Sequence, residues 1–257
     1  LEEETGEFFE KVISLLDRLS GTVSPSFFFQ NIWLVMLTSP ASRGTALNFL
    51  SRRLPRFDTQ EDMTHVVGRD IGLMIRAFAA ALEDDNLLVR RGALDLLLQS
   101  MKIDSIAVLR AQPADRAILM RAAVSVVLRR DLALNRRLYT WLLGPDEKSE
   151  AQIAHYKDHA LALLRSTLKE DMDAPSGEYP ESRPFKIFIS LLDKWEVGAP
   201  LTENLVYDAL LCLKRLMQAS PDPSSDIAMT ASTLYEAVEP QILCKRLLSS
   251  ITAEIIG

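Results

Sequence analysis

The chain has 257 residues, of which 48% are hydrophobic and 25% are charged, and its formal net charge is −6. This composition is typical of a folded globular protein. The only two cysteines, Cys212 and Cys244, exclude a disulfide framework and favour a reducing compartment, where we expect both thiols to be buried. The most apolar stretch, 27–37, is too short to span a bilayer, and the acidic start predicts no secretory signal.

Helices are predicted from the first residues onward. Apolar side chains recur at three- and four-residue spacing near the start, which is typical of an amphipathic helix that ends near Ser20; they are Phe8, Val12, Leu15, Leu16 and Leu19. A second helix opens at Ser24-Pro25, and we expect it to be buried because it is apolar nearly all round. A third helix is predicted from Ser39-Pro40 to Leu54.

Further along the chain the pattern stays helical, and no alternating strand pattern of useful length appears. One long helix is predicted over 58–82, and another from about Ala114 to Arg130. Residues 171–184 are polar and rich in helix breakers, which predicts a mobile loop. Because helices resume at similar spacing after this loop, we interpret 1–257 as a single α-solenoid.

A repeat organises the first half of the chain. The segment that begins Arg43-Gly44-Thr45-Ala46-Leu47 aligns with the segments that contain Arg90 and Arg137, at an offset of 47 residues each time (90 − 43 and 137 − 90). A looser fourth copy near Arg183 falls one residue short of the next period. Helical repeats of this length are typical of HEAT- or armadillo-like solenoids, which bind partners and seldom catalyse reactions. The predicted fold class is therefore an all-α, HEAT/armadillo-like solenoid.

Acidic residues precede two of the repeated arginines at the same distance. Asp84 lies six residues before Arg90, and Asp131 lies six residues before Arg137. We expect these aspartates and arginines to form a ladder of contacts between neighbouring repeats.

The charge is spread unevenly. Residues 43–140 carry 16 Lys and Arg against 11 Asp and Glu, a balance of +5, although the whole chain is acidic. Arginine suits forked contacts with carboxylates and phosphates. The candidate residues for an acidic partner or a phosphoinositide are Arg52, Arg53, Arg56, Arg91, Arg129, Arg130 and Arg136. The alternative is that at least half of the arginines belong to the ladder or to solvated helix ends.

The sequence gives little support for metal binding, catalysis or nucleic-acid binding. His155 and His159 are spaced four apart, as in zinc proteases, but a third ligand is not evident, so we predict no metal. No nucleophile motif or glycine-rich phosphate loop is present, so we predict neither catalytic residues nor a cofactor. Nucleic acid fits poorly, because the chain is acidic overall and lacks interleaved aromatic residues.

Several long sequence segments carry a family resemblance. Ser20–Trp33, Ala46–Leu50 and Val89–Leu97 resemble the N-terminal region of the Dopey family, and Leu128–Leu138 does so most specifically. The resemblance covers most of the chain through residue 145 and continues more weakly to the end.

The resemblance implies a peripheral membrane protein on the cytoplasmic face of Golgi and endosome membranes. It also implies protein partners: a large Sec7-related scaffold, and in some species a phospholipid flippase or kinesin light chain. Because the family's chains are several times longer, and because the chain starts without Met and ends in apolar Ile255-Ile256-Gly257, we expect it to be part of a longer protein.

Three functional hypotheses follow. The first is a non-catalytic adaptor in endosome–Golgi traffic that acts by protein–protein binding. The second is direct membrane targeting, in which the arginines bind a phosphoinositide. The third, an enzyme that uses His155 and His159, would require a bound metal.

Overall fold

A computed structural model describes residues 8–175, 177–219 and 222–242, together with Cys244, Leu248 and Thr252. The ends of the chain, from which we inferred a longer protein, lie outside the described residues, as do Ser220 and Pro221. Every regular element in the described part is helical, which confirms the all-α fold class. None of the described helices combines the length and the apolar character needed to cross a membrane.

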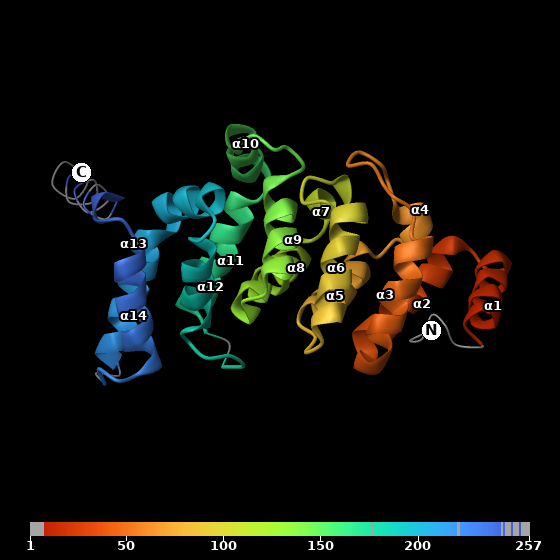
Figure 1. The fold of residues 1–257 in the computed structure, drawn as a ribbon, viewed down its shortest axis with the longest axis horizontal. Helices are drawn as coiled ribbons and strands as arrows, with labels where there is room; N and C mark the ends of the chain where they lie inside the picture. Colours follow the sequence, from red (N-terminus) through yellow and green to blue (C-terminus); the bar gives the residue numbers. More distant parts are fainter. Residues whose placement is uncertain are drawn as a thin grey trace. The chain divides into compact units, whose positions relative to one another are not determined.

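The chain forms two compact units, Leu1–Gly144 and Pro145–Gly257. Figure 1 labels their helices. The helices of the first unit are α1 (Phe9–Thr22), α2 (Pro25–Thr38), α3 (Arg43–Arg53), α4 (Thr64–Val67), α5 (Ile71–Leu82), α6 (Leu87–Ser100), α7 (Ile106–Arg110), α8 (Pro113–Ser125) and α9 (Leu132–Leu143), with 3₁₀ turns η1 (Pro40–Ser42) and η2 (Val126–Arg129). The prediction that 1–257 is one continuous solenoid concerns how the two units join, and it stays a prediction.

The first unit is a solenoid of two helix rows. In one row α2 packs on α5 and α5 on α8; in the other, α3 packs on α6 and α6 on α9. Helices α3, α6 and α9 begin at residues 43, 87 and 132, so their starts are 44 and 45 residues apart. This spacing is that of helical solenoid repeats. The 47-residue period of the sequence stays a prediction, because the aligned arginines occupy different positions in their helices. Arg43 is the first residue of α3, whereas Arg137 is the sixth residue of α9.

Two buried tryptophans each donate a hydrogen bond to a backbone carbonyl of a neighbouring layer. The indole Nε1 of Trp33 donates to the carbonyl of Val67 at 3.0 Å, and that of Trp141 donates to the carbonyl of Met101 at 3.0 Å. Both rings are almost fully buried, so each indole N–H needs such a partner.

The helix predicted over 58–82 is wrong, because the structure breaks it. Gly68 has φ +104°, a conformation that L residues rarely adopt, and a Cβ there would lie 2.5 Å from Cγ of Gln30. Asp70 then caps a new helix by accepting a hydrogen bond from the backbone N–H of Leu73 at 3.1 Å. The segment is therefore a turn, the short α4 and α5.

Two burial predictions also need correction. In α2, Phe29, Trp33 and Met36 are buried, but Phe27 and Leu34 are exposed, so the helix is not buried all round. Cys212 is buried as expected, and its Sγ donates to the carbonyl of Met172 at 2.9 Å, whereas Cys244 is exposed.

The second unit contains α10 (Ser149–His159), α11 (Leu161–Asp173), α12 (Arg183–Leu191), α13 (Trp195–Ala219) and α14 (Asp226–Ala237). Helix α11 packs on α13 and α12 on α14. Because α11 continues to Asp173 and α12 begins at Arg183, the connection between them is shorter than the predicted 171–184 loop. Lys186 of α12 binds Asp226 at the start of α14, with Nζ 2.7 Å from Oδ1, and holds the pKa of that carboxyl below its usual range.

Candidate interaction surface

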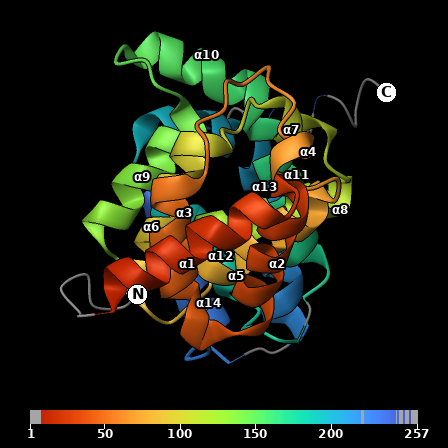
Figure 2. The ribbon, with the colours of Figure 1, turned by 90° about the vertical axis from the view of Figure 1, so that its right-hand side faces the viewer.

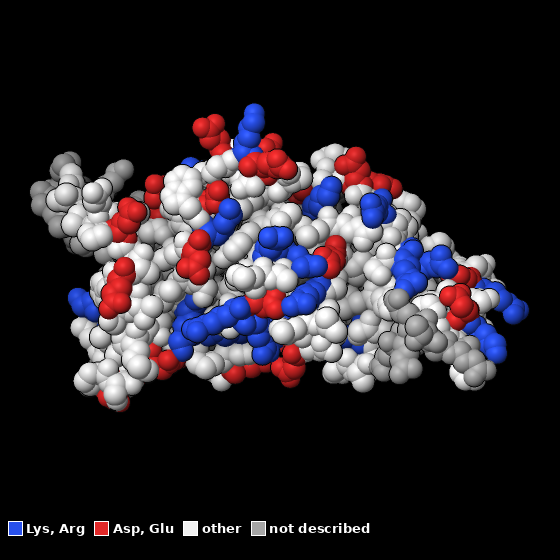
Figure 3. Space-filling view, in the orientation of Figure 1, with Lys and Arg blue, Asp and Glu red and all other residues white. Residues whose placement is uncertain are grey.

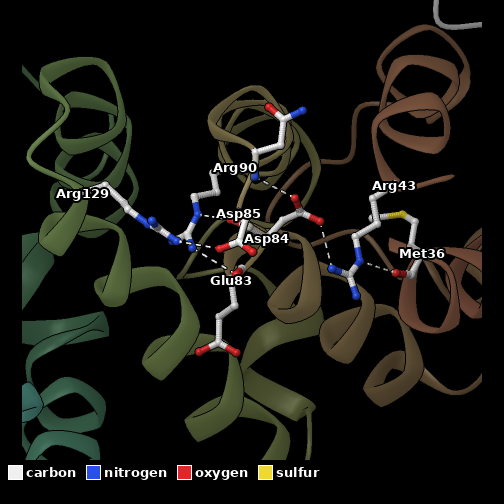
Figure 4. Close-up of polar contacts among 8 residues, drawn as sticks. Met36, Arg43, Glu83, Asp84, Asp85, Arg90 and Arg129 are labelled. Atoms are coloured by element: carbon white, nitrogen blue, oxygen red, sulfur yellow. Dashed lines mark hydrogen bonds and ion pairs between the residues drawn. The ribbon is translucent and has the colours of Figure 1, made fainter. Parts of the chain in front are cut away.

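Several arginines of the first unit bind aspartates of the neighbouring layer. Arg43 of α3 contacts Asp84, just before α6, with Nη1 and Oδ2 2.9 Å apart. Arg91 of α6 contacts Asp131, just before α9, with Nη2 and Oδ2 2.7 Å apart. We call these two pairs the arginine ladder; Figure 4 shows the first of them.

The ladder uses different arginines from those predicted. Arg90 is buried, and its guanidinium donates to the carbonyls of Glu83 and Asp84, at the end of α5 in its own repeat. A cation there satisfies carbonyls that the helix leaves open, and burial lowers the pKa of the Arg90 guanidinium. Arg137 does reach the preceding layer, but its Nε donates to Asp95 within α6, at 2.6 Å, rather than to Asp131.

Asp131 takes part in the arginine ladder and also caps a helix. Its Oδ1 accepts a hydrogen bond from the backbone N–H of Leu134 at 2.9 Å and caps α9, while its Oδ2 binds Arg91. The backbone N–H of Leu134, and then Arg91, hold the pKa of this carboxyl below its usual range. The aspartate therefore fixes where α9 begins and also binds that start to α6.

The predicted candidate arginines divide into two sets. In the first set, Arg53 binds Asp17 at 2.6 Å, Arg91 binds Asp131, and Arg129 binds Asp85 at 3.2 Å. Arg52 belongs with them, because its Nε donates to Oδ1 of Asn48 at 3.1 Å. These four side chains take part in internal contacts of the unit.

The second set is Arg56, Arg130 and Arg136. All three are exposed, and none of them forms an ion pair with another described residue. Arg130 adopts the left-handed backbone region at φ 52° in the turn before α9, and Arg136 lies on α9. Figure 3 shows Lys and Arg side chains gathered where α6 and α9 lie in Figure 1, with Asp and Glu among them.

Sequence reasoning missed the leucines at the starts of these helices. Leu132, the first residue of α9, is 86% exposed, and Leu88, the second of α6, is 71% exposed. Leu88 lies at a groove of about 630 Å³ between α3 and α6, which is lined by small residues such as Gly44, Thr45 and Gly92. The available signal was an apolar residue one or two positions after the capping residue, in a turn that is otherwise polar.

The predicted histidine pair lies on α10, with the ring centroids of His155 and His159 4.7 Å apart. Within the part of the chain that the structure describes, no group of three or more His, Cys, Asp or Glu side chains is placed to hold a metal ion.

The fold and this surface define an all-α solenoid of the kind that presents extended faces to partners. Residues 1–147 match the family model described as Dopey, N-terminal, and residues 155–255 match the DOP1 middle TPR domain. The chain belongs to the Dopey family. The first match ends at residue 147 and the second begins at residue 155, close to the division between the two compact units after Gly144.

Among curated proteins, the chain is similar to Protein dop1 of Emericella nidulans, with 30% identity over 315 residues, which covers 98% of this chain and 17% of that protein. It is also similar to Protein DOP1B of Mus musculus, with 32% identity over 238 residues, covering 81% and 10%. Protein pad-1 of Caenorhabditis elegans is 29% identical over 245 residues, again covering 81% and 10%. The chain thus spans 10–17% of the length of these relatives. No solved structure matches it.

Proposed function

We propose that this chain is a non-catalytic adaptor module of a peripheral membrane protein, which binds proteins during vesicle traffic between endosomes and the Golgi. The module would act on the cytoplasmic face of those membranes. Its partners would be a large Sec7-related scaffold and, in some species, a flippase or kinesin light chain. The match to a TPR domain supports protein binding, since stacked helical repeats offer long continuous faces.

One observation carries the proposal: the start of α9 exposes side chains that the packing of the unit does not use. Leu132 is 86% exposed, and Arg136, four residues later, lies on the same face of the helix. Arg130 adds a second cation in the preceding turn. Protein interfaces combine an apolar centre with arginine in this way.

The test is the affinity of the purified chain for a recombinant Sec7-related scaffold, measured by surface plasmon resonance. We expect the double variant Leu132→Ser, Arg136→Glu to bind at least tenfold more weakly. The matched control, Leu211→Ser with Lys157→Glu, changes an exposed leucine and an exposed lysine of the second unit and should bind as the original does. Equal binding by both variants would remove this surface from the function.

A second candidate function, phosphoinositide-dependent membrane targeting, is favoured by the three exposed arginines outside the ladder. Arg56, Arg130 and Arg136 are available to a phosphate because no carboxylate among the described residues binds them. Flotation with vesicles that contain phosphatidylinositol 4-phosphate, compared with neutral vesicles, tests it. Binding that is weakened by salt and abolished by Arg130→Glu with Arg136→Glu would support membrane targeting over protein binding; flotation that the double variant leaves intact would exclude these arginines.

A further inference from the structure

The outer side of α1 exposes a continuous row of apolar side chains. Phe8, Val12, Leu15 and Leu19 are 63%, 36%, 55% and 48% exposed, and their spacing of four, three and four residues places them on one face of the helix. From these residues, with Leu16, the sequence predicted an amphipathic helix. Figure 2 shows α1 lying across α2, with one side open to the viewer.

The inward contacts of α1 are made by a different row. Phe9 is buried, Ile13 and Leu16 are half-buried, and these residues are also spaced by four and three. Consecutive residues of a helix are about 100° apart, so the two rows lie side by side around the axis. Because Phe9, Ile13 and Leu16 already hold α1 in place, the outer row is left for another occupant.

Two of the candidate arginines, Arg52 and Arg53, contact α1 and fix its position. Arg53 at the end of α3 binds Asp17 of α1, with Nη2 and Oδ2 2.6 Å apart. The guanidinium of Arg52 lies over the ring of Phe9, 5.3 Å from its centroid. These contacts hold the exposed row at a defined angle on the unit.

The width of the exposed row favours a helix as its occupant. The four residues fall within an arc of about 60° at 100° per residue. That is the narrow seam of a helix pair, in which apolar residues alternate at spacings of three and four. A helix that lies in a membrane surface needs a broader apolar face, of roughly 100° or more.

The charged residues beside the row indicate which kind of helix can bind there. Lys11 and Arg18, each one residue before a member of the row, are exposed along one border, and the Lys11 Nζ lies 5.2 Å from the centroid of the Phe8 ring. Glu10 and Asp17 lie on the opposite side of the helix by their positions in the sequence. In an antiparallel pair with a second copy of α1, Lys11 and Arg18 would face the same basic border of that copy. Like charges that face each other across a helix pair repel.

An apolar hollow at the same end of the unit offers a further contact. It has a volume of about 260 Å³ and lies where α1, α2 and α3 meet, lined by Leu16, Phe28, Val35 and Phe49 among others. This volume suits one large side chain of a partner, as in interfaces that bury an aromatic or aliphatic anchor.

We propose that the outer face of α1 is a docking site for one amphipathic helix of a partner protein, whose apolar row is bordered by Asp or Glu. This inference rests on the proposed adaptor function and names the chemistry of one of its partners. The row supplies the apolar seam, and Lys11 and Arg18 select carboxylates on the incoming helix.

The test uses two fluorescein-labelled synthetic helical peptides, with Leu at the seam positions and either Glu or Lys at the border positions. Fluorescence anisotropy with the whole chain should show that the Glu peptide binds at least tenfold more tightly than the Lys peptide. The variant Leu15→Ser, Leu19→Ser should lose that binding by at least tenfold, while Leu211→Ser, an exposed leucine of α13, should not. Lys11→Glu with Arg18→Glu should reverse the preference between the peptides.

Any one of four outcomes would overturn the proposal. Equal binding of the two peptides, or binding that survives Leu15→Ser, Leu19→Ser, would show that α1 does not select an acidic helix. A dimer in sedimentation equilibrium that the same variant dissociates would assign the face to a second copy. Binding to phosphatidylserine vesicles that the variant abolishes would assign it to lipid. None of these depends on Leu132 and Arg136, so the scaffold-binding test separates failure of the proposal from failure of the adaptor function.

Discussion

The arginine ladder makes an energetic prediction for Arg43 and Asp84. Their side chains are only 13% and 12% exposed, and the Nη1–Oδ2 distance is 2.9 Å. Each also has a second tie: Arg43 Nε donates to the carbonyl of Met36 at 2.8 Å, and Asp84 Oδ1 accepts from the backbone N–H of Asn86 at 2.9 Å. With both groups held in place, little conformational entropy is lost when they pair.

A charge-assisted hydrogen bond of this kind contributes about 1.5–3 kcal/mol. We therefore expect a double-mutant cycle of Arg43→Ala and Asp84→Ala to give a coupling energy of about 2 kcal/mol. Asp84→Ala alone should cost about 3 kcal/mol, because it also strands a mostly buried guanidinium. The Arg129–Asp85 pair is the matched control: its side chains are 41% and 101% exposed, and its coupling should be indistinguishable from zero.

The assay is urea unfolding of the N-terminal unit, followed by the fluorescence of its two tryptophans, Trp33 and Trp141. A Trp195→Phe background removes the exposed tryptophan of the second unit. Because burial limits screening, the Arg43–Asp84 coupling should persist in 1 M salt. A coupling below about 0.5 kcal/mol, or one that salt abolishes, would refute the view that partly buried pairs hold the layers together.

Three further predictions concern single positions. Gly68→Ala should lower the free energy of unfolding by about 2 kcal/mol, because φ is +104° and the added Cβ has no room. Gly21→Ala, which adds a Cβ in open space within α1, should raise the free energy of unfolding by up to about 1 kcal/mol. The urea midpoints of the two variants test both expectations. Burial raises the pKa of the Cys212 thiol, so a thiol reagent at pH 8 should modify Cys244 at once and Cys212 only on unfolding, and rapid loss of both would contradict the structure. The depressed pKa of Asp226 contributes stability that is complete above pH 4 and lost as the pH falls through the folded value, so Asp226→Asn should flatten the decline in urea midpoint between pH 5 and pH 2.

Periodicity predicted the helices well where each turn has a clear signal. Pro25, Pro40 and Pro113 mark helix starts in the structure as they do in the sequence. The break at Gly68 was missed, because the apolar spacing continues across it and only a positive φ distinguishes this glycine from one inside a helix.

Which side chains contact one another was less predictable from the sequence than where the helices lie. The repeated arginines indicated contacts between layers, yet Arg90 and Arg91 are neighbours in sequence and one is buried in its own repeat while the other reaches Asp131. Which of two adjacent side chains faces the next layer depends on a rotation of about 100°, which a shift of one residue in the helix start is enough to change. In α1, likewise, Phe8 and Phe9 begin two apolar rows, and the spacing alone does not indicate which row packs inward.

The ties between layers of the N-terminal unit have a consequence for how it folds. The side-chain hydrogen bonds that join Trp33, Arg43, Arg91 and Trp141 to a neighbouring layer span 34, 41, 40 and 40 residues of chain. Loop-closure entropy grows only with the logarithm of the span, so each layer closes at nearly the same entropic cost. Folding can then nucleate at any layer and propagate to its neighbours, and hydrogen exchange should be slowest in the central α5 and α6 and faster toward α1, whose amides would open without unfolding the rest.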